Sequence, residues 1–293
     1  MRNRLCTLLL IGALSVGTSA SAQCERCRTD EEVLRWNPNS SREHQLAPWP
    51  GHRIIDNVYY VGTRNLASFL IATSAGHILI NSNDEQTLPL IRKSVEELGF
   101  EWTDIGIVLG SHAHADHMSA NATIKGQTGA LLMAMREDIP LLAEMTPGSR
   151  SPPVDRVLRH RDTITLGGET LTAHLTAGHT PGTTTWTLEA EEDGTEYDVV
   201  FLGGATATPR TDVTSTDIQK QFQEAFIVLR GLSCDVPLGP HAPIHHMEEK
   251  FRLLEKGEGP NPYIDPQGCQ DELSLSERVF YLLLGKQLGT QRT

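Results

Sequence analysis

The sequence lacks an apolar run long enough to cross a bilayer, and it lacks a cluster of basic residues. The apolar run at residues 5–16 is about a dozen residues long, whereas a membrane-spanning helix needs about 20. The chain has 25 Lys and Arg against 37 Asp and Glu, which gives a formal net charge of −12. Because like charges repel, such a chain is a poor partner for nucleic acid and for anionic membranes. We therefore expect neither a membrane anchor nor a nucleic-acid partner.

The first 22 residues have the pattern of a secretory signal peptide. A short basic start at 1–4 precedes the apolar run, and Ser19–Ala22 supplies the small residues of a cleavage site. The alternative interpretation is a buried N-terminal helix. A lipoprotein anchor at Cys24 is disfavoured, because Gln23 is not the small residue that such processing requires. We expect cleavage after Ala22, export to the periplasm, and a single mature domain over 23–293.

Cysteine is scarce, with 5 residues in the chain, and Cys6 lies in the expected signal peptide. Cys24, Cys27, Cys234 and Cys269 remain, an even number in an exported chain, so disulfides are expected. Four cysteines can be paired in more than one way, and the sequence alone does not choose among the pairings. We interpret Cys24 and Cys27 as structural, rather than as a redox pair or half of a zinc site, because no second such pair is present.

Strand and helix patterns occur in two rounds along the chain, after a polar, irregular stretch at 23–50. The first round predicts strands at 58–61, 69–73, 77–80, 105–109 and 130–133, and helices at 87–98, 119–124 and 136–144. The second round predicts strands at 163–166, 171–175, 183–188, 197–202 and 236–238, and helices at 216–229, 247–255 and 276–284. This order predicts an α/β fold in which two facing sheets carry helices on their outer sides.

Four candidate metal ligands follow the strand at 105–109, namely His112, His114, Asp116 and His117. The two histidines of His112-Ala113-His114 are two residues apart, so an extended segment points both to the same side. Asp116 and His117 begin a helix, where adjacent side chains diverge. This pattern suits two metal ions, and imidazole with one carboxylate favours zinc. The alternative is a polar loop whose histidines are merely solvated.

Two further histidines stand in rigid turns where a strand ends. His179 lies in Ala177–Gly182 and His241 lies in Leu238–Pro243, both rich in Gly and Pro. His179 would join His112 and His114 on one ion and leave an open position for water, whereas closed structural sites use four protein ligands. His241 would complete a second site with Asp116 and His117. We therefore expect two zinc ions per chain. For His245 and His246 we consider two interpretations, namely a role in lining the pocket or supporting a ligand, and an ordinary role as surface or packing residues.

These residues resemble the metallo-β-lactamase superfamily, and within it the third subclass (B3) of the class B β-lactamases. The phrases that carry the resemblance are Gly110–His117, Thr176–Thr180, Cys234–Gly239 and Asn261–Gly268. The resemblance implies an αβ/βα four-layer sandwich with both metals at one rim and a Cys234–Cys269 disulfide. It also implies hydrolysis of the β-lactam amide bond by a metal-bound hydroxide, with Asp116 as the catalytic residue that orients the hydroxide and passes a proton to the leaving nitrogen.

The segment after the strand at 197–202 departs from several relatives. Lactonases and glyoxalase-type thioesterases place a bridging aspartate there, and the first lactamase subclass a zinc-binding cysteine, but this chain has Gly203–Thr206. Closer relatives have a Gly-Ser segment whose serine orients the lactam, and Thr206 or Thr208 would replace that hydroxyl. We expect a small-molecule β-lactam substrate (penicillins, cephalosporins or carbapenems) and a role in antibiotic resistance. The alternatives are a zinc hydrolase of another ester, lactone or amide, and a non-catalytic zinc-binding protein.

Overall fold

The computed structural model describes residues 29–35, 41–145 and 154–290. The expected signal peptide at 1–22 and the cysteines Cys24 and Cys27 lie outside the described residues. Within the described residues, no helix combines the length and the apolar character needed to cross a membrane.

The first sheet has seven strands in the order β1-β2-β3-β4-β5-β6-β7. Their bounds are β1 (His52–Ile55), β2 (Val58–Tyr60), β3 (Phe69–Thr73), β4 (Gly76–Ile80), β5 (Ile105–Leu109), β6 (Leu131–Met135) and β7 (Arg156–Leu158). Strands β1 to β4 form an antiparallel meander, and β4 to β7 run parallel. The parallel strands need crossovers, and these contain α3 (Leu88–Glu97), η2 (Trp102–Asp104), α4 (Ala115–Met118), α5 (Asn121–Thr128), η3 (Arg136–Asp138) and α6 (Ile139–Glu144).

The second sheet has five strands in the order β12-β11-β10-β9-β8. Their bounds are β8 (Thr163–Leu166), β9 (Glu169–Leu175), β10 (Thr184–Glu192), β11 (Thr195–Phe201) and β12 (Val236–Leu238). Neighbouring strands are antiparallel except β11 and β12, which are parallel and are joined through α7 (Thr216–Arg230). The chain ends with η5 (Ala242–His245), α8 (Met247–Lys256) and α9 (Pro266–Thr290).

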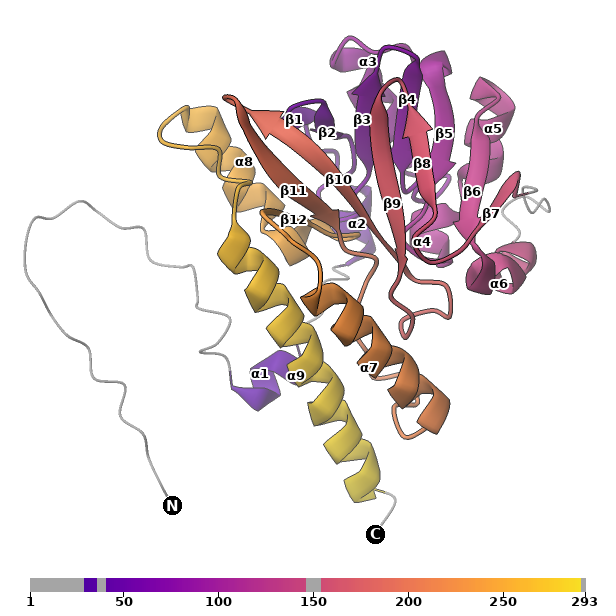
Figure 1. The fold of residues 1–293 in the computed structure, drawn as a ribbon, viewed down its shortest axis with the longest axis vertical. Coiled ribbons are helices and arrows are strands. Elements are labelled where there is room, and N and C mark those ends of the chain that lie inside the picture. Colours follow the sequence, from indigo (N-terminus) through magenta and orange to yellow (C-terminus); the bar gives the residue numbers. More distant parts are fainter. Residues whose placement is uncertain (1–28, 36–40, 146–153, 291–293) are drawn as a thin grey trace, which may run out of the picture.

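The two sheets face each other across a shared apolar core (Figure 1). Alternation along β3 creates this arrangement, because Phe69 and Ile71 point into the core between the sheets while Leu70 points to the other face. On that outer face Leu70 packs in a cluster with Ile91 of α3 and Ile124 of α5. The layers are therefore helix, sheet, sheet and helix, which confirms the predicted four-layer sandwich.

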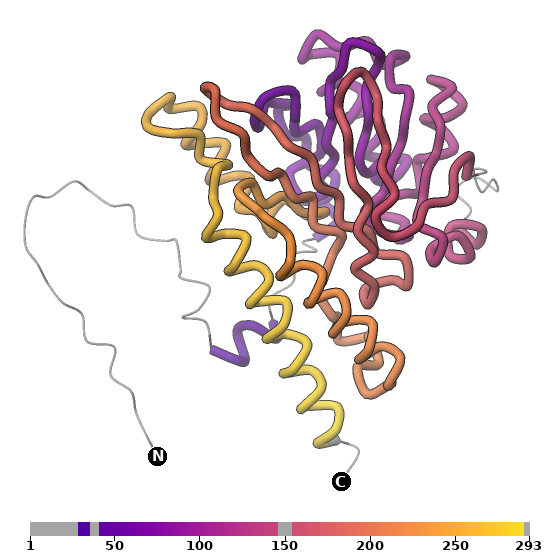
Figure 2. Tube along the Cα trace, in the orientation of Figure 1, coloured from indigo at the N-terminus to yellow at the C-terminus, as the bar shows by residue number. Residues whose placement is uncertain are grey.

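Helices α7 and α9 form the other outer layer and lie side by side, extending beyond the second sheet (Figure 2). Phe222 and Phe226 of α7 pack against Phe280 of α9. The disulfide between Cys234 and Cys269, which the resemblance implies, joins the start of α9 to the segment before β12. This layer fixes the segment that follows β11, which lies against the candidate site described below.

The sequence pattern misses several elements. The sequence pattern predicts an irregular stretch at 23–50, but α1 (Asp30–Arg35) and α2 (Arg42–Leu46) are helical. The predicted helix at 276–284 is the middle of α9, whose first turns, from Pro266, are too polar to show apolar spacing. Strands β1 and β7 were not predicted, because each is a short edge segment at the end of the first sheet.

Candidate metal centre

The structure brings the six sequence candidates together in two adjacent groups. We call them the three-histidine group (His112, His114, His179) and the aspartate group (Asp116, His117, His241). Within each group, the atoms that could bind a metal lie within 4.8 Å of one another. The ring centroid of His112 lies 4.4 Å from that of His117, so the two groups adjoin.

The loop after β5 positions four of the six side chains. His114 has extended backbone angles (φ −109°, ψ 153°) and precedes the first turn of α4, which carries Asp116 and His117. The loop passes close to α4 at Gly110, where a Cβ atom would lie 2.3 Å from the Met118 sulfur. A larger residue at this position would therefore displace the Met118 side chain, through which α4 packs against the loop.

Backbone hydrogen bonds hold this loop against the neighbouring segments of both sheets. The Ser111 N–H donates to Asn81 Oδ1 over 2.8 Å, and the Ser111 carbonyl accepts from the Thr184 N–H over 2.7 Å. The His117 carbonyl accepts from the Asn83 N–H over 3.0 Å. The loop is thus fixed on both sides, which limits how far the imidazoles can move.

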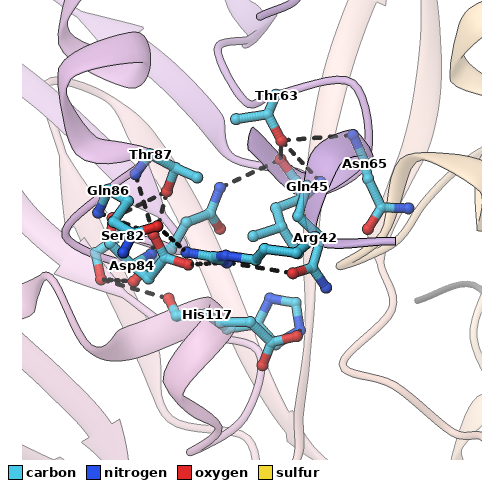
Figure 3. Close-up of polar contacts among 12 residues, drawn as sticks. Arg42, Gln45, Thr63, Asn65, Ser82, Asp84, Gln86, Thr87 and His117 are labelled. Carbon is cyan, nitrogen blue, oxygen red and sulfur yellow. Dashed lines mark hydrogen bonds and ion pairs between the residues drawn. The ribbon is translucent and has the colours of Figure 1, made fainter. Parts of the chain in front are cut away.

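The segment from Ser82 to Thr87 also anchors α2 beside the aspartate group (Figure 3). Asp84 forms an ion pair with Arg42 of α2 over 2.6 Å, and the Gln86 side-chain oxygen accepts a hydrogen bond from the same guanidinium over 2.8 Å. The Ser82 hydroxyl lies 3.4 Å from the His117 carbonyl. One short segment therefore contacts both α2 and the loop that carries His117.

His179 and His241 come from tight turns at the ends of strands in the second sheet. His179 lies between β9 and β10, after Gly178, whose φ of +138° is a conformation that favours glycine. His241 follows β12, and its loop is held to the first sheet, where the Ala242 N–H donates to the Asn65 carbonyl over 2.7 Å. Each group therefore combines side chains from both halves of the sandwich.

Three of the histidines use Nδ1 for a hydrogen bond to the protein. His112 Nδ1 donates to the Gly203 carbonyl over 2.7 Å, and His179 Nδ1 donates to the Thr206 carbonyl over 2.8 Å. His241 Nδ1 lies 3.3 Å from Asn65 Oδ1. With Nδ1 protonated, Nε2 carries the free lone pair. This pattern orients metal-binding histidines in proteins.

Three ring nitrogens in these groups receive no hydrogen bond from the part of the chain that the structure describes. Nε2 of His112 and both ring nitrogens of His117 are buried without a hydrogen bond among the described residues. Buried polar atoms are usually paired, so these atoms fit a bound cation. Asp116 Oδ2 lies 3.6 Å from His117 Nε2 and 3.7 Å from His241 Nε2, with space between them for one ion.

The ionisation states also fit a metal. Burial, together with nearby imidazoles, holds the pKa of His112 well below its ordinary value of 6.5. Burial lowers the pKa of His179 to about 4 and that of His241 to about 3. Burial disfavours the Asp116 carboxylate, but His117 and His241 bring its pKa below its ordinary value. At neutral pH His112, His179 and His241 are therefore neutral imidazoles and Asp116 is a carboxylate, the forms that bind metal.

The segment 203–208 lies against the three-histidine group but offers it no carboxylate. Gly204 has a φ of +111°, and a Cβ atom there would lie 3.3 Å from His112 Nδ1. The Thr206 hydroxyl lies 3.3 Å from the Ser276 hydroxyl of α9, and the Thr208 hydroxyl lies 3.1 Å from that of Thr211. The hydroxyls of Thr206 and Thr208, which the sequence predicts as substrate contacts, thus each have a hydrogen-bond partner in the protein.

Some supporting residues carry no signal in the sequence. Asn65, which contacts His241, is 176 residues away from it along the chain. No local sequence pattern links Asn65 to His241, so this contact could be predicted only from a known fold. His245 is buried, and its Nδ1 accepts from the Gly239 N–H over 3.2 Å, so it supports the turn that carries His241. His246 is exposed and directly precedes α8.

Comparison with known proteins identifies relatives along most of the chain. The family model "Metallo-beta-lactamase superfamily" matches residues 61–193. The native FEZ-1 metallo-β-lactamase from Legionella gormanii is 38% identical, with a TM-score of 0.78 over 82% of this chain and 97% of that chain. BJP-1, a subclass B3 metallo-β-lactamase of Bradyrhizobium japonicum, is 33% identical, with a TM-score of 0.80 over 86% of this chain and 100% of that chain.

Two curated relatives match over a shorter region. They are the hydroxyacylglutathione hydrolases of Rhizobium meliloti (strain 1021), 27% identical over 114 residues, and of Hyphomonas neptunium, 32% identical over 103 residues. These matches span 39% and 35% of this chain, and 40% and 36% of the relatives' lengths. On its fold, its two ligand groups and its identity to FEZ-1 and BJP-1, the chain belongs to the metallo-β-lactamase superfamily.

Proposed function

We propose that this protein is a zinc-dependent β-lactamase that opens the amide bond of penicillins, cephalosporins or carbapenems. The observation that carries the proposal is the pair of adjacent groups, one of three imidazoles and one with the single carboxylate Asp116. The similarity to FEZ-1 and BJP-1, which covers 97% and 100% of their chains, supports the lactam as substrate, because both are described as metallo-β-lactamases. In a cell, this activity would confer resistance to these antibiotics.

The donor set supports two zinc ions, one in each group. Five imidazoles and one carboxylate are ligands that zinc accepts, and LRA-12, a B3 metallo-β-lactamase that is 27% identical, is described as a di-zinc protein. Bound zinc would supply Lewis-acid polarisation of a carbonyl and water that is acidic near neutral pH. In the three-histidine group, three protein ligands leave a coordination position for substrate or water.

The residues of the chain then have distinct tasks. His114 is exposed and His112 is buried, so the three-histidine group is reached from the side of His114. The Asp116 side chain is 24% exposed and ionised at neutral pH, so it would orient the attacking water and hold the proton that passes to the leaving nitrogen. Removing that proton-transfer step should cost roughly 10²–10⁴ in rate.

Thr206 and Thr208 are proposed substrate contacts. The Thr206 carbonyl accepts from His179 Nδ1, which places this residue beside the three-histidine group. Its hydroxyl would exchange Ser276 for a polar group of the substrate, at little cost because one hydrogen bond replaces another. Thr206→Val should therefore raise KM with kcat unchanged, whereas a purely structural hydroxyl would leave KM unaltered.

The second candidate function is hydrolysis of another ester, thioester, lactone or amide by the same centre. The similarity to two hydroxyacylglutathione hydrolases favours a thioester. The segment 203–208 contacts the three-histidine group through Gly203 and Thr206. Glyoxalase-type thioesterases place a bridging aspartate in this segment, and its lack of a carboxylate therefore disfavours a thioester substrate. A non-catalytic zinc-binding protein is disfavoured because three ligands leave one position open.

We further propose that 23–293 is one domain, exported to the periplasm after cleavage at Ala22.

One experiment separates these functions. The protein is freed of metal with a chelator, and zinc is then returned in steps while hydrolysis of a lactam panel and of a glutathione thioester is recorded. The proposal predicts that lactam hydrolysis is lost with the chelator and restored by zinc. Zinc-restored thioester hydrolysis without lactam hydrolysis would establish the second candidate, and zinc binding without either activity would establish the binding protein.

A further inference from the structure

Asp138 is a buried carboxylate outside both ligand groups. It is 2% exposed and stands at the end of η3, directly before α6. An aspartate before a helix usually accepts a hydrogen bond from the first turn of that helix, but the Asp138 side chain makes no such bond. Its oxygens are used elsewhere, which points to a role other than starting α6.

The Asp138 carboxylate joins the two loops that carry the three-histidine group. Its Oδ2 accepts from the Ala113 N–H, between His112 and His114, over 2.8 Å. The same oxygen accepts from the Thr180 hydroxyl over 2.8 Å, and Oδ1 accepts from the Gly182 N–H over 2.7 Å. Ala113 lies in the loop after β5 of the first sheet, whereas Thr180 and Gly182 lie in the turn that carries His179, between β9 and β10 of the second sheet.

The close approach of the two loops is built into the turn. A Cβ atom at position 182 would lie 2.4 Å from the Asp138 backbone nitrogen and 2.6 Å from its Cγ, so Gly182 is required there. The Thr180 N–H also donates to the Thr183 hydroxyl over 2.9 Å, which makes the turn around His179 rigid. A shift of Asp138 would therefore move the whole turn, and His179 with it, relative to His112 and His114.

We propose that Asp138 is a positioning residue that fixes the distance between His179 and the pair His112 and His114, and so sets the zinc affinity of the three-histidine group. Groups that orient metal ligands from outside typically contribute about 10- to 100-fold in metal affinity. The aspartate group has no hydrogen bond to this carboxylate among the described residues. This inference rests on the proposed metal centre.

The substitution Asp138→Asn tests this role, because the amide has the same shape as the carboxylate but offers fewer hydrogen-bond acceptors. Two of the three partners are backbone N–H groups, one on each carboxylate oxygen. In either orientation, the Asn NH₂ group must face one of these N–H donors, and a donor cannot accept. One loop must therefore move, whichever orientation is adopted.

The test measures zinc affinity in each group separately by competition with a chromophoric chelator. The His241→Ala background reports on the three-histidine group, and the His179→Ala background reports on the aspartate group. We expect Asp138→Asn to weaken zinc binding about 10- to 100-fold in the first background and less than about twofold in the second. Asp155→Asn is the matched control, because Asp155 also accepts a backbone N–H, from Leu132, without touching a ligand loop.

Three results would overturn the inference. They are no loss in either background, an equal loss in both, or an equal loss with Asp155→Asn. If Asp138→Asn does not fold, Thr180→Val removes one of the three hydrogen bonds and should produce a smaller loss in the same background. If neither background variant binds zinc while Asp138 is left unchanged, the proposed metal centre itself is refuted, and the positioning role with it.

Discussion

The pH dependence of stability can be worked out for His52, a buried histidine outside both ligand groups. It is 7% exposed, its Nδ1 donates to the Pro50 carbonyl over 3.0 Å, and its Nε2 accepts from the Tyr263 hydroxyl over 2.6 Å. Burial lowers its pKa from 6.5 to about 4. Protonation would remove the lone pair that accepts from Tyr263 and would place a charge in the core.

The sign and size of the effect follow from proton binding. Between pH 6.5 and about 4 the unfolded chain binds the His52 proton and the folded protein does not, so stability falls as the pH falls through this window. Each pH unit is worth about 1.36 kcal/mol, so at pH 5 His52 alone lowers the free energy of unfolding by about 2 kcal/mol. His179 and His241 act in the same direction in the zinc-free protein, because burial lowers their pKa values too.

The assay is urea denaturation of chelator-treated protein at pH 7 and pH 5, for the unaltered chain and for His52→Gln. Gln does not titrate, so the variant should lose about 2 kcal/mol less between the two pH values, whatever its stability at pH 7. A loss of stability that is the same in both proteins would refute the reasoning, because His52 would then titrate alike in the folded and unfolded states.

Three other predictions concern the site and the disulfide. Asp116→Asn should lower kcat/KM for a chromogenic cephalosporin about 10²- to 10⁴-fold, and activity within a few-fold of the original would contradict the proton-holding role. Asn65→Leu should weaken zinc binding about 10-fold in the His179→Ala background, because His241 loses the partner of Nδ1; unchanged affinity would show that Asn65 does not orient the ring. Replacing Cys234 and Cys269 by Ser opens a loop with a sequence separation of 35 residues and should lower the free energy of unfolding by about 2–5 kcal/mol, measured in urea, and no change would contradict that contribution.

The fold was largely predictable because its elements carry local signals. Strands β3 and β4 alternate between two buried faces, and α3 has apolar residues at helical spacing, so each could be read from a short window. Strands β1 and β7 could not, because each is short and contains an arginine among its three or four residues, so neither shows an apolar run or an alternation. The start of α9 was missed for a similar reason, since its first turns are polar and its packing against α1 and α7 is a tertiary property.

The ligand groups and their support differ in the same way. Four candidate ligands lie within 112–117, and His179 and His241 stand in turns of Gly and Pro, so local patterns single out all six. Asp138 and Asn65 carry no such pattern, because each acts through contacts with segments distant along the chain. The side chains that hold the imidazoles in place can be identified only from the packing of the two sheets, and not from the sequence near each ligand.

The most direct test of the zinc centre is the metal content of the folded protein after equilibrium dialysis against buffered zinc. The proposal predicts two zinc ions per chain, falling to one in His241→Ala and to one in His179→Ala. A chain that binds no zinc, or a stoichiometry that neither substitution changes, would contradict it.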